Sequence, residues 1–133
     1  MSDGLDRAGR SSLHYAALDG EVDEVARLIA EGYDVSLPDQ AAYTPLHFAA
    51  QGQHAEVARA LPAAGAPVDP QDRFGKTPLG VALSKVRDDE SEGAVVYVLL
   101  AARADPDLEN FYGISPRGHA KSVTNFDLMR FFR

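Results

Sequence analysis

Two histidines at a fixed interval are the residues whose type and spacing first suggest chemistry. His14 ends the tetrapeptide "SSLH" and His47 ends "TPLH", 33 residues further along the chain. An imidazole titrates near neutral pH and can serve as a general acid, a general base or a metal ligand. Neither histidine is accompanied by an evident nucleophile or ligand set. The repeated placement instead suggests a structural role, in which each histidine belongs to a recurring unit.

The other candidate catalytic residues are equally isolated. His54 lies in "QGQHAE", where we expect a solvated or helix-capping side chain, and we expect His119 to be partly buried. H-E-x-x-H, Walker-type and G-x-S-x-G motifs and paired carboxylates are absent from the sequence. The chain also has no cysteine, which excludes disulfides and thiolate chemistry. We therefore predict no catalytic residue, no metal site and no cofactor.

Composition limits the classes of partner. The 133 residues are enough for one domain, 1–133, and are 45% hydrophobic and 25% charged, as in globular proteins. A net charge of -7 argues against nucleic acid and against an anionic membrane as partners. The N-terminus shows no secretory signal, and the longest apolar run, 94–102, is too short to span a bilayer. We expect a cytoplasmic protein.

The elements that must position these residues recur at a fixed period. Asp6, Asp39, Asp72 and Asn110 each open a similar segment, which divides the chain into units 6–38, 39–71, 72–109 and 110–133. The first two units have 33 residues each, the third carries five extra residues, and the fourth is shorter. Such a period is typical of stacked repeats.

Each unit predicts a turn followed by two helices. Ser11, Thr44, Thr77 and Ser115 stand where they can cap a helix, and in three units proline follows at the first helical position. The first helix is short and rich in alanine. The second is longer, with an apolar stripe of Val22, Val25, Leu28 and Ile29 in the first unit. Gly32 and Gly65 stand where such helices end in the left-handed conformation.

The period and the motif "TPLHFAA" at 44–50 resemble the ankyrin repeat family over almost the whole chain. The resemblance implies an all-α solenoid of about four stacked helix-turn-helix units, with β-turn fingers projecting along one edge. It also implies that His14 and His47 bond to backbone between adjacent repeats.

Several residues depart from the family pattern. Pro62 replaces a leucine late in a second helix, where we expect a kink or an early helix end. Arg103 replaces the terminal glycine, so we expect a rearranged turn. Gly80 replaces the histidine of the third unit, and Arg117 and Gly118 replace "LH" in the fourth. The acidic insertion 87–93 predicts an exposed extension, and the apolar segment 126–132 predicts a cover for the end of the stack.

The resemblance implies that finger tips and the inner face of the first helices contact a partner. The corresponding residues here are Arg7, Arg10, Tyr43, Gln51, Arg73, Phe74, Lys76, Lys85, Phe111, Tyr112 and Ile114. This strip is basic and aromatic although the chain is acidic, which favours an acidic protein surface over nucleic acid. The alternative for Phe74 and Phe111 is that they fold back over the neighbouring turn.

The resemblance favours a non-catalytic, monomeric protein-binding module. One hypothesis is an inhibitor that occludes a single partner, such as a bacterial immunity protein that neutralises a toxin domain. The alternative is an adaptor or scaffold that docks a partner without inhibiting it. Two further alternatives are an enzyme with a site around His119 or His54, and a homo-oligomer formed through Phe131 and Phe132.

Overall fold

Helices alternate with projecting loops along the chain. The computed structural model describes residues 5–87, 93–123 and 127–132. These residues form seven α-helices and a 3₁₀ helix, and no strand among themselves. The helices are α1 (Ser12–Asp19), α2 (Val22–Ala30), α3 (Pro45–Gln51), α4 (Ala55–Ala63), α5 (Pro78–Lys85), α6 (Ala94–Ala101), α7 (Pro116–Ser122) and the 3₁₀ helix η1 (Leu128–Phe132).

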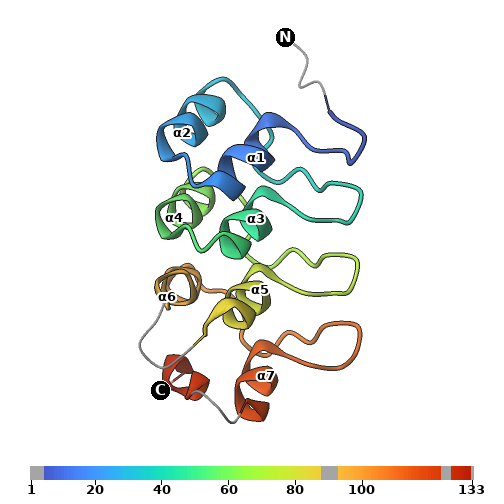
Figure 1. Ribbon diagram of the computed structural model, residues 1–133, viewed down its shortest axis with the longest axis vertical. Coiled ribbons are helices and arrows are strands. Elements are labelled where there is room, and N and C mark those ends of the chain that lie inside the picture. The colour runs from blue at the N-terminus through green and yellow to red at the C-terminus, as the bar shows by residue number, and fades with distance from the viewer. Residues whose placement is uncertain (1–4, 88–92, 124–126, 133) are drawn as a thin grey trace.

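The helices stack in two columns. Figure 1 shows α1, α3, α5 and α7 in an inner column, with α2, α4, α6 and η1 in an outer column beside it. The loops that precede the inner helices project to one side as a row of fingers. The predicted all-α solenoid of about four stacked units is therefore confirmed. The grouping of residues 1–133 into a single domain stays a prediction.

The inner helices begin as the sequence predicts. The hydroxyl oxygens of the four cap residues each accept a hydrogen bond from a backbone N–H of the first helical turn: Leu13 for Ser11, His47 for Thr44, Gly80 for Thr77 and Gly118 for Ser115. Proline occupies the first helical position of α3, α5 and α7, where its missing N–H has no partner to lose. The same local chemistry thus starts each inner helix.

The core lies between the two columns. Leu13, Leu46 and Leu79 occupy the same position in successive inner helices, and all three are fully buried. Small alanines beside them, such as Ala17 and Ala50, are also fully buried and let neighbouring units approach closely. The predicted stripe on α2 is confirmed for Val25, Leu28 and the partly buried Ile29, but Val22 lies at the solvent face.

The outer helices α2, α4 and α6 are each followed by a residue with a positive φ. Gly32 and Gly65 have φ of 93° and 100°, as predicted. We expected a kink or an early helix end at Pro62. The early end is wrong, because α4 continues to Ala63 and has the same length as α2, whereas the kink stays a prediction. Pro62 lies in the last turn, where few backbone hydrogen bonds remain to be broken.

The rearranged turn expected at Arg103 is also wrong. Arg103 takes a φ of 72°, so an arginine adopts the conformation that glycine adopts in the first two units. The N–H of Ala104 bonds to the Leu99 carbonyl, just as that of Ala66 bonds to the Leu61 carbonyl. The hydrogen bonds that close the helix, and the burial of Ala104, outweigh the strain of the left-handed arginine.

The C-terminal segment covers the end of the stack, as predicted. Leu128 and Phe131 of η1 are buried, and the Phe131 ring meets the Tyr97 ring of α6 at 4.9 Å between centroids. Burial of Phe131 leaves it unavailable for a contact between copies of the chain. The acidic insertion falls largely on residues 88–92, which lie outside the described residues.

Candidate protein-binding surface

Each finger is built around its first side chain. The Oδ1 atom of Asp39 accepts hydrogen bonds from the N–H groups of Ala41 and Tyr43, both at 2.8 Å. The same pair of bonds, two and four residues further on, forms at Asp6, Asp72 and Asn110. Short Asp and Asn side chains suit this role because they reach the backbone of their own turn. The fingers therefore share one shape.

Consecutive fingers are joined by equivalent backbone hydrogen bonds. The bonds run from Gln40 N–H to the Ala8 carbonyl, from Arg73 N–H to the Ala41 carbonyl, and from Phe111 N–H to the Phe74 carbonyl, at 2.8, 2.9 and 3.0 Å. They hold the fingers side by side along the edge seen in Figure 1. Side chains at neighbouring tips consequently form a continuous surface.

The two motif histidines bridge neighbouring units. Nδ1 of His47 accepts the N–H of Thr44 at 3.1 Å, which places the ring proton on Nε2. Nε2 then donates to the Lys76 carbonyl of the next finger at 2.8 Å. His14 makes the same pair of bonds with Ser11 and Tyr43. Both rings are fully buried, and burial lowers the pKa of each. The predicted structural role is confirmed.

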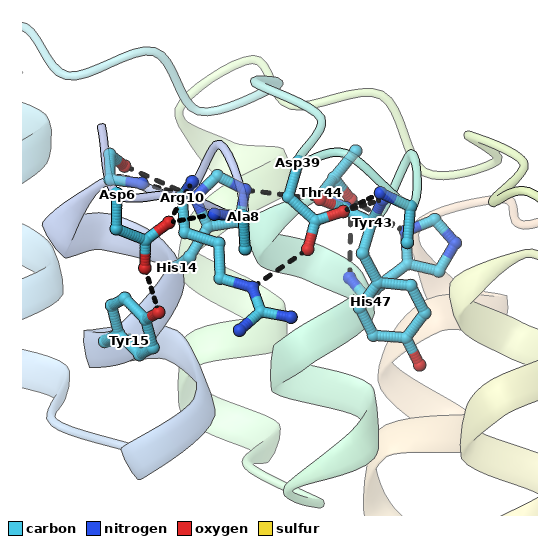
Figure 2. A network of polar contacts seen from close by, with 11 residues as sticks. Asp6, Ala8, Arg10, His14, Tyr15, Asp39, Tyr43, Thr44 and His47 are labelled. Carbon is cyan, nitrogen blue, oxygen red and sulfur yellow. Dashed lines mark hydrogen bonds and ion pairs between the residues drawn. The ribbon is translucent and has the colours of Figure 1, made fainter.

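Two of the predicted contact residues have partners within the chain. Figure 2 shows the Arg10 guanidinium reaching the Asp39 carboxylate, with 3.0 Å between Nε and Oδ2. Arg10 also lies over the Phe48 ring, at 5.2 Å from its centroid. The ring of Tyr43 stacks on His47 at 4.5 Å, and burial raises the pKa of Tyr43 to about 12. These side chains stabilise the stack, and their contact with a partner stays a prediction.

The third and fourth fingers bring large apolar side chains together at the surface. Phe74, Phe111, Tyr112 and Ile114 are 49%, 67%, 72% and 50% exposed. Arg73 lies over the Phe74 ring at 5.3 Å. The Phe111 ring crosses the preceding finger, since a Cβ at Gly75 would lie 2.6 Å from it. Phe111 thus folds back in part, yet most of its surface faces solvent.

The remaining predicted residues are more dispersed. Arg7 is exposed on the first finger, at the opposite end of the row from the aromatic cluster. Gln51 is exposed at the end of α3, whereas Lys85 at the end of α5 is half-buried. Lys76 is half-buried beside the aromatic fingers, and burial lowers its pKa. The structure therefore concentrates the predicted surface on units three and four.

Sequence reasoning assigned His54 incorrectly. His54 stands at the N-cap of α4, but its side chain makes no capping hydrogen bond. Its Nε2 instead pairs with the Leu18 carbonyl of the preceding unit at 2.8 Å. The ring fits between Gly20 and Gly52, where an added Cβ would approach it to 2.4 and 2.5 Å. Gly20 and Gly52 were the sequence signal that could have predicted this packing of the His54 ring.

His119 is half-buried, as expected, and faces the junction between units three and four. Burial, and then the charge of Lys76, lower its pKa, so the ring is neutral at pH 7. Within the described ranges, no three His, Asp or Glu side chains gather as a metal ion would require.

None of the described helices is long and apolar enough to cross a bilayer.

Comparison with known proteins identifies the family. The sequence profile of ankyrin repeats (three copies) matches residues 13–110, about three quarters of the chain. A search of curated proteins finds no match. The profile ends at Asn110, so the fourth unit rests on the structure, which gives it a finger, α7 and η1. With its period, histidine bridges and stacked helix pairs, the chain belongs to the ankyrin repeat family, whose members are protein–protein interaction modules.

Proposed function

We propose that this protein is a non-catalytic inhibitor that binds one partner protein through the third and fourth fingers and occludes it. The observation that carries the proposal is the exposed cluster of Phe74, Phe111, Tyr112 and Ile114. Half of the large hydrophobic side chains that are exposed in the described residues lie on these two fingers. Large apolar side chains exposed on two adjacent fingers are typical of an interaction site.

The composition of the patch fits a strong protein contact. Aromatic side chains bury large areas at a small entropic cost, and arginine adds directed hydrogen bonds. Arg73 lies over Phe74 and presents its charge beside the aromatic cluster. Steering by this charge favours an acidic surface on the partner. The immunity-type role, with a toxin domain as the partner, is the most specific form of the proposal and derives from the family.

Capture from a lysate of the source organism tests the location of the surface. We expect immobilised wild-type protein to retain one partner in stoichiometric amount, and Arg73→Glu/Phe74→Ala to lose it. Val22→Ala/Arg59→Glu is the matched control, because it removes one exposed apolar side chain and reverses one exposed arginine on the outer helices. Equal retention by both variants would place the interface elsewhere, provided that circular dichroism shows unchanged helix content.

The adaptor or scaffold remains the second candidate function. An assay of the captured partner's own activity separates the two. Loss of activity at one equivalent of the protein supports an inhibitor. Unchanged activity in the complex supports a scaffold.

A further inference from the structure

The junction between units three and four lacks two side chains that are present at the other two junctions. The first is the bridging histidine, since Gly80 stands where His14 and His47 stand. The second is the acidic residue that opens a finger, since Asn110 stands where Asp39 and Asp72 stand. Asn110 still orders its own turn through Oδ1. It brings no negative charge to the neighbouring unit.

At the junction of units one and two, the same places hold an ion pair. Arg10 is the fifth residue of the first finger, and its guanidinium pairs with Asp39, whose side chain is almost completely buried. Lys76 is the fifth residue of the third finger, and Asn110 is the first residue of the next finger, where Asp39 stands in the second. Both residues line the same cleft. Lys76 forms no ion pair within the described residues. Its own finger's Asp72 favours the charged form, but burial outweighs this effect and lowers the pKa of Lys76.

The missing side chains leave a cleft of about 130 Å³ between the two units. Lys76 lies along its wall, because a Cβ at Gly80 would meet the Lys76 Cγ at 3.1 Å. His119, Asn110 and Ser115 also line the cleft. Leu108, Ile114 and Pro116 supply apolar walls. The cleft opens beside the exposed fingers that carry the proposed partner surface.

We propose that this cleft binds a carboxylate side chain, Asp or Glu, of the partner protein, next to the ammonium group of Lys76. The proposal rests on the proposed function for the source of the carboxylate. The partner's carboxylate would take the place that Asp39 takes beside Arg10. The apolar walls would contact its methylene groups.

The charge of the cleft favours a carboxylate over a phosphate group. Lys85 lies near enough to lower the pKa of Lys76, and His119 is neutral at pH 7. Among the residues that line the cleft, Lys76 alone carries a full positive charge, so the cleft suits the single negative charge of a carboxylate better than the nearly double charge of a phosphate group. A half-buried lysine that forms no ion pair within the described residues gains from a charge-assisted hydrogen bond to a single carboxylate.

A small-molecule probe tests the cleft without the partner. The full-length ¹⁵N-labelled chain is titrated with N-acetyl-glutamate N-methylamide, and binding is followed by the amide shifts of Gly80 and Gly118. We expect saturable shifts confined to residues around the cleft. The neutral N-acetyl-glutamine N-methylamide should bind at least about tenfold more weakly than the glutamate probe.

Three variants locate the binding. Lys76→Met removes the charge and should weaken binding of the glutamate probe about tenfold or more. Gly80→His should do the same by occupying the cleft and displacing the Lys76 stem, while restoring a residue that the fold accepts at His14 and His47. Lys121→Met is the matched control, because it removes an exposed lysine of α7 and should leave binding unchanged.

Equal shifts with the glutamine probe, no saturable shift, or an equal loss in Lys121→Met would overturn the proposal. Tighter binding of inorganic phosphate than of the glutamate probe would overturn the assignment to a carboxylate. If the lysate capture fails but the probe titration is positive, the proposed function is rejected and the proposal that the cleft binds a carboxylate stands. If the capture succeeds but the probe titration is negative, only the proposal that the cleft binds a carboxylate is rejected.

Discussion

The first and third junctions of the stack use the same backbone and different side chains. At the first junction, between units 6–38 and 39–71, His14 bonds to the Tyr43 carbonyl and Arg10 pairs with Asp39. At the third junction, between units 72–109 and 110–133, Gly80 and Asn110 provide neither contact. The backbone bond between fingers is nevertheless present at both, from Gln40 to Ala8 and from Phe111 to Phe74.

The first junction therefore contributes mainly to the stability of the stack, whereas the third junction carries the features that suit partner binding. The first junction has its buried polar groups satisfied within the chain, so it contributes to the stack and offers little to a partner. The third junction combines a half-buried lysine, a cleft and exposed aromatic side chains. In a repeat protein each unit depends on its neighbours, so one junction can be left open while the others hold the fold.

The largest effect is expected from Leu46→Ala in the well-packed part of the stack. Leu46 is fully buried between units, and its truncation should lower the free energy of unfolding by about 2–5 kcal/mol, measured by denaturant titration. The matched variant is Arg117→Ala at the equivalent position of α7, which pairs with Asp107 near the surface. Arg117→Ala should lower the free energy of unfolding much less than Leu46→Ala does. Equal losses would mean that unit four is packed as tightly as unit two.

Acid should weaken the histidine bridges. Burial lowers the pKa of His14 and His47, so below about pH 6.5 the unfolded chain binds more protons than the folded chain. The free energy of unfolding should therefore fall with decreasing pH, by at most about 2.7 kcal/mol per pH unit from these two residues. Denaturant titrations between pH 7.5 and 5.5 measure the slope. A flat profile would contradict the neutral, bridging state of the histidines.

Gly80→His should make the third junction resemble the first. The new imidazole can donate to the Ile114 carbonyl, and the substitution removes a glycine from the interior of α5. We expect the free energy of unfolding to rise by about 1 kcal/mol, which raises the melting temperature by a few degrees. A lower melting temperature would show that the Lys76 stem cannot leave its place over residue 80.

The smallest effects concern the ends of the outer helices. Arg103→Gly removes the strain of a left-handed arginine and should add about 1 kcal/mol or less. Pro62→Leu restores a backbone hydrogen bond near the end of α4 and should also raise the melting temperature. Thermal unfolding followed by circular dichroism checks both. Gly65→Ala at the equivalent turn should lower stability, because alanine would then have to adopt a φ near 100°.

The sequence predicted the fold well because its signals are local. Hydroxyl caps, prolines and the repeated apolar positions act within a few residues, and they placed the inner helices correctly. The early helix end expected at Pro62 and the rearranged turn expected at Arg103 were wrong where packing of the whole unit overrode a local preference. A helix that docks against its neighbours tolerates one unfavourable residue near its end.

The candidate site was harder to predict because it depends on contacts between units. Arg10, Tyr43 and Lys76 are each the fifth residue of a finger in the sequence. Arg10 and Tyr43 nevertheless have side-chain partners in the chain, whereas Lys76 forms no ion pair within the described residues. The cleft beside Lys76 arises from two substitutions, at Gly80 and Asn110, which lie 30 residues apart. Their joint effect appears only when the two units are stacked.

Hydrogen exchange at two equivalent amides tests the central claim that the first junction is closed by side chains and the third is open. The N–H of Gln40 and the N–H of Phe111 make the same finger-to-finger bond, each at one end of the stack. We predict slower exchange at Gln40 than at Phe111, and selective slowing at Phe111 in Gly80→His. Equal protection in the wild type, with no change at Phe111 in the variant, would contradict the account.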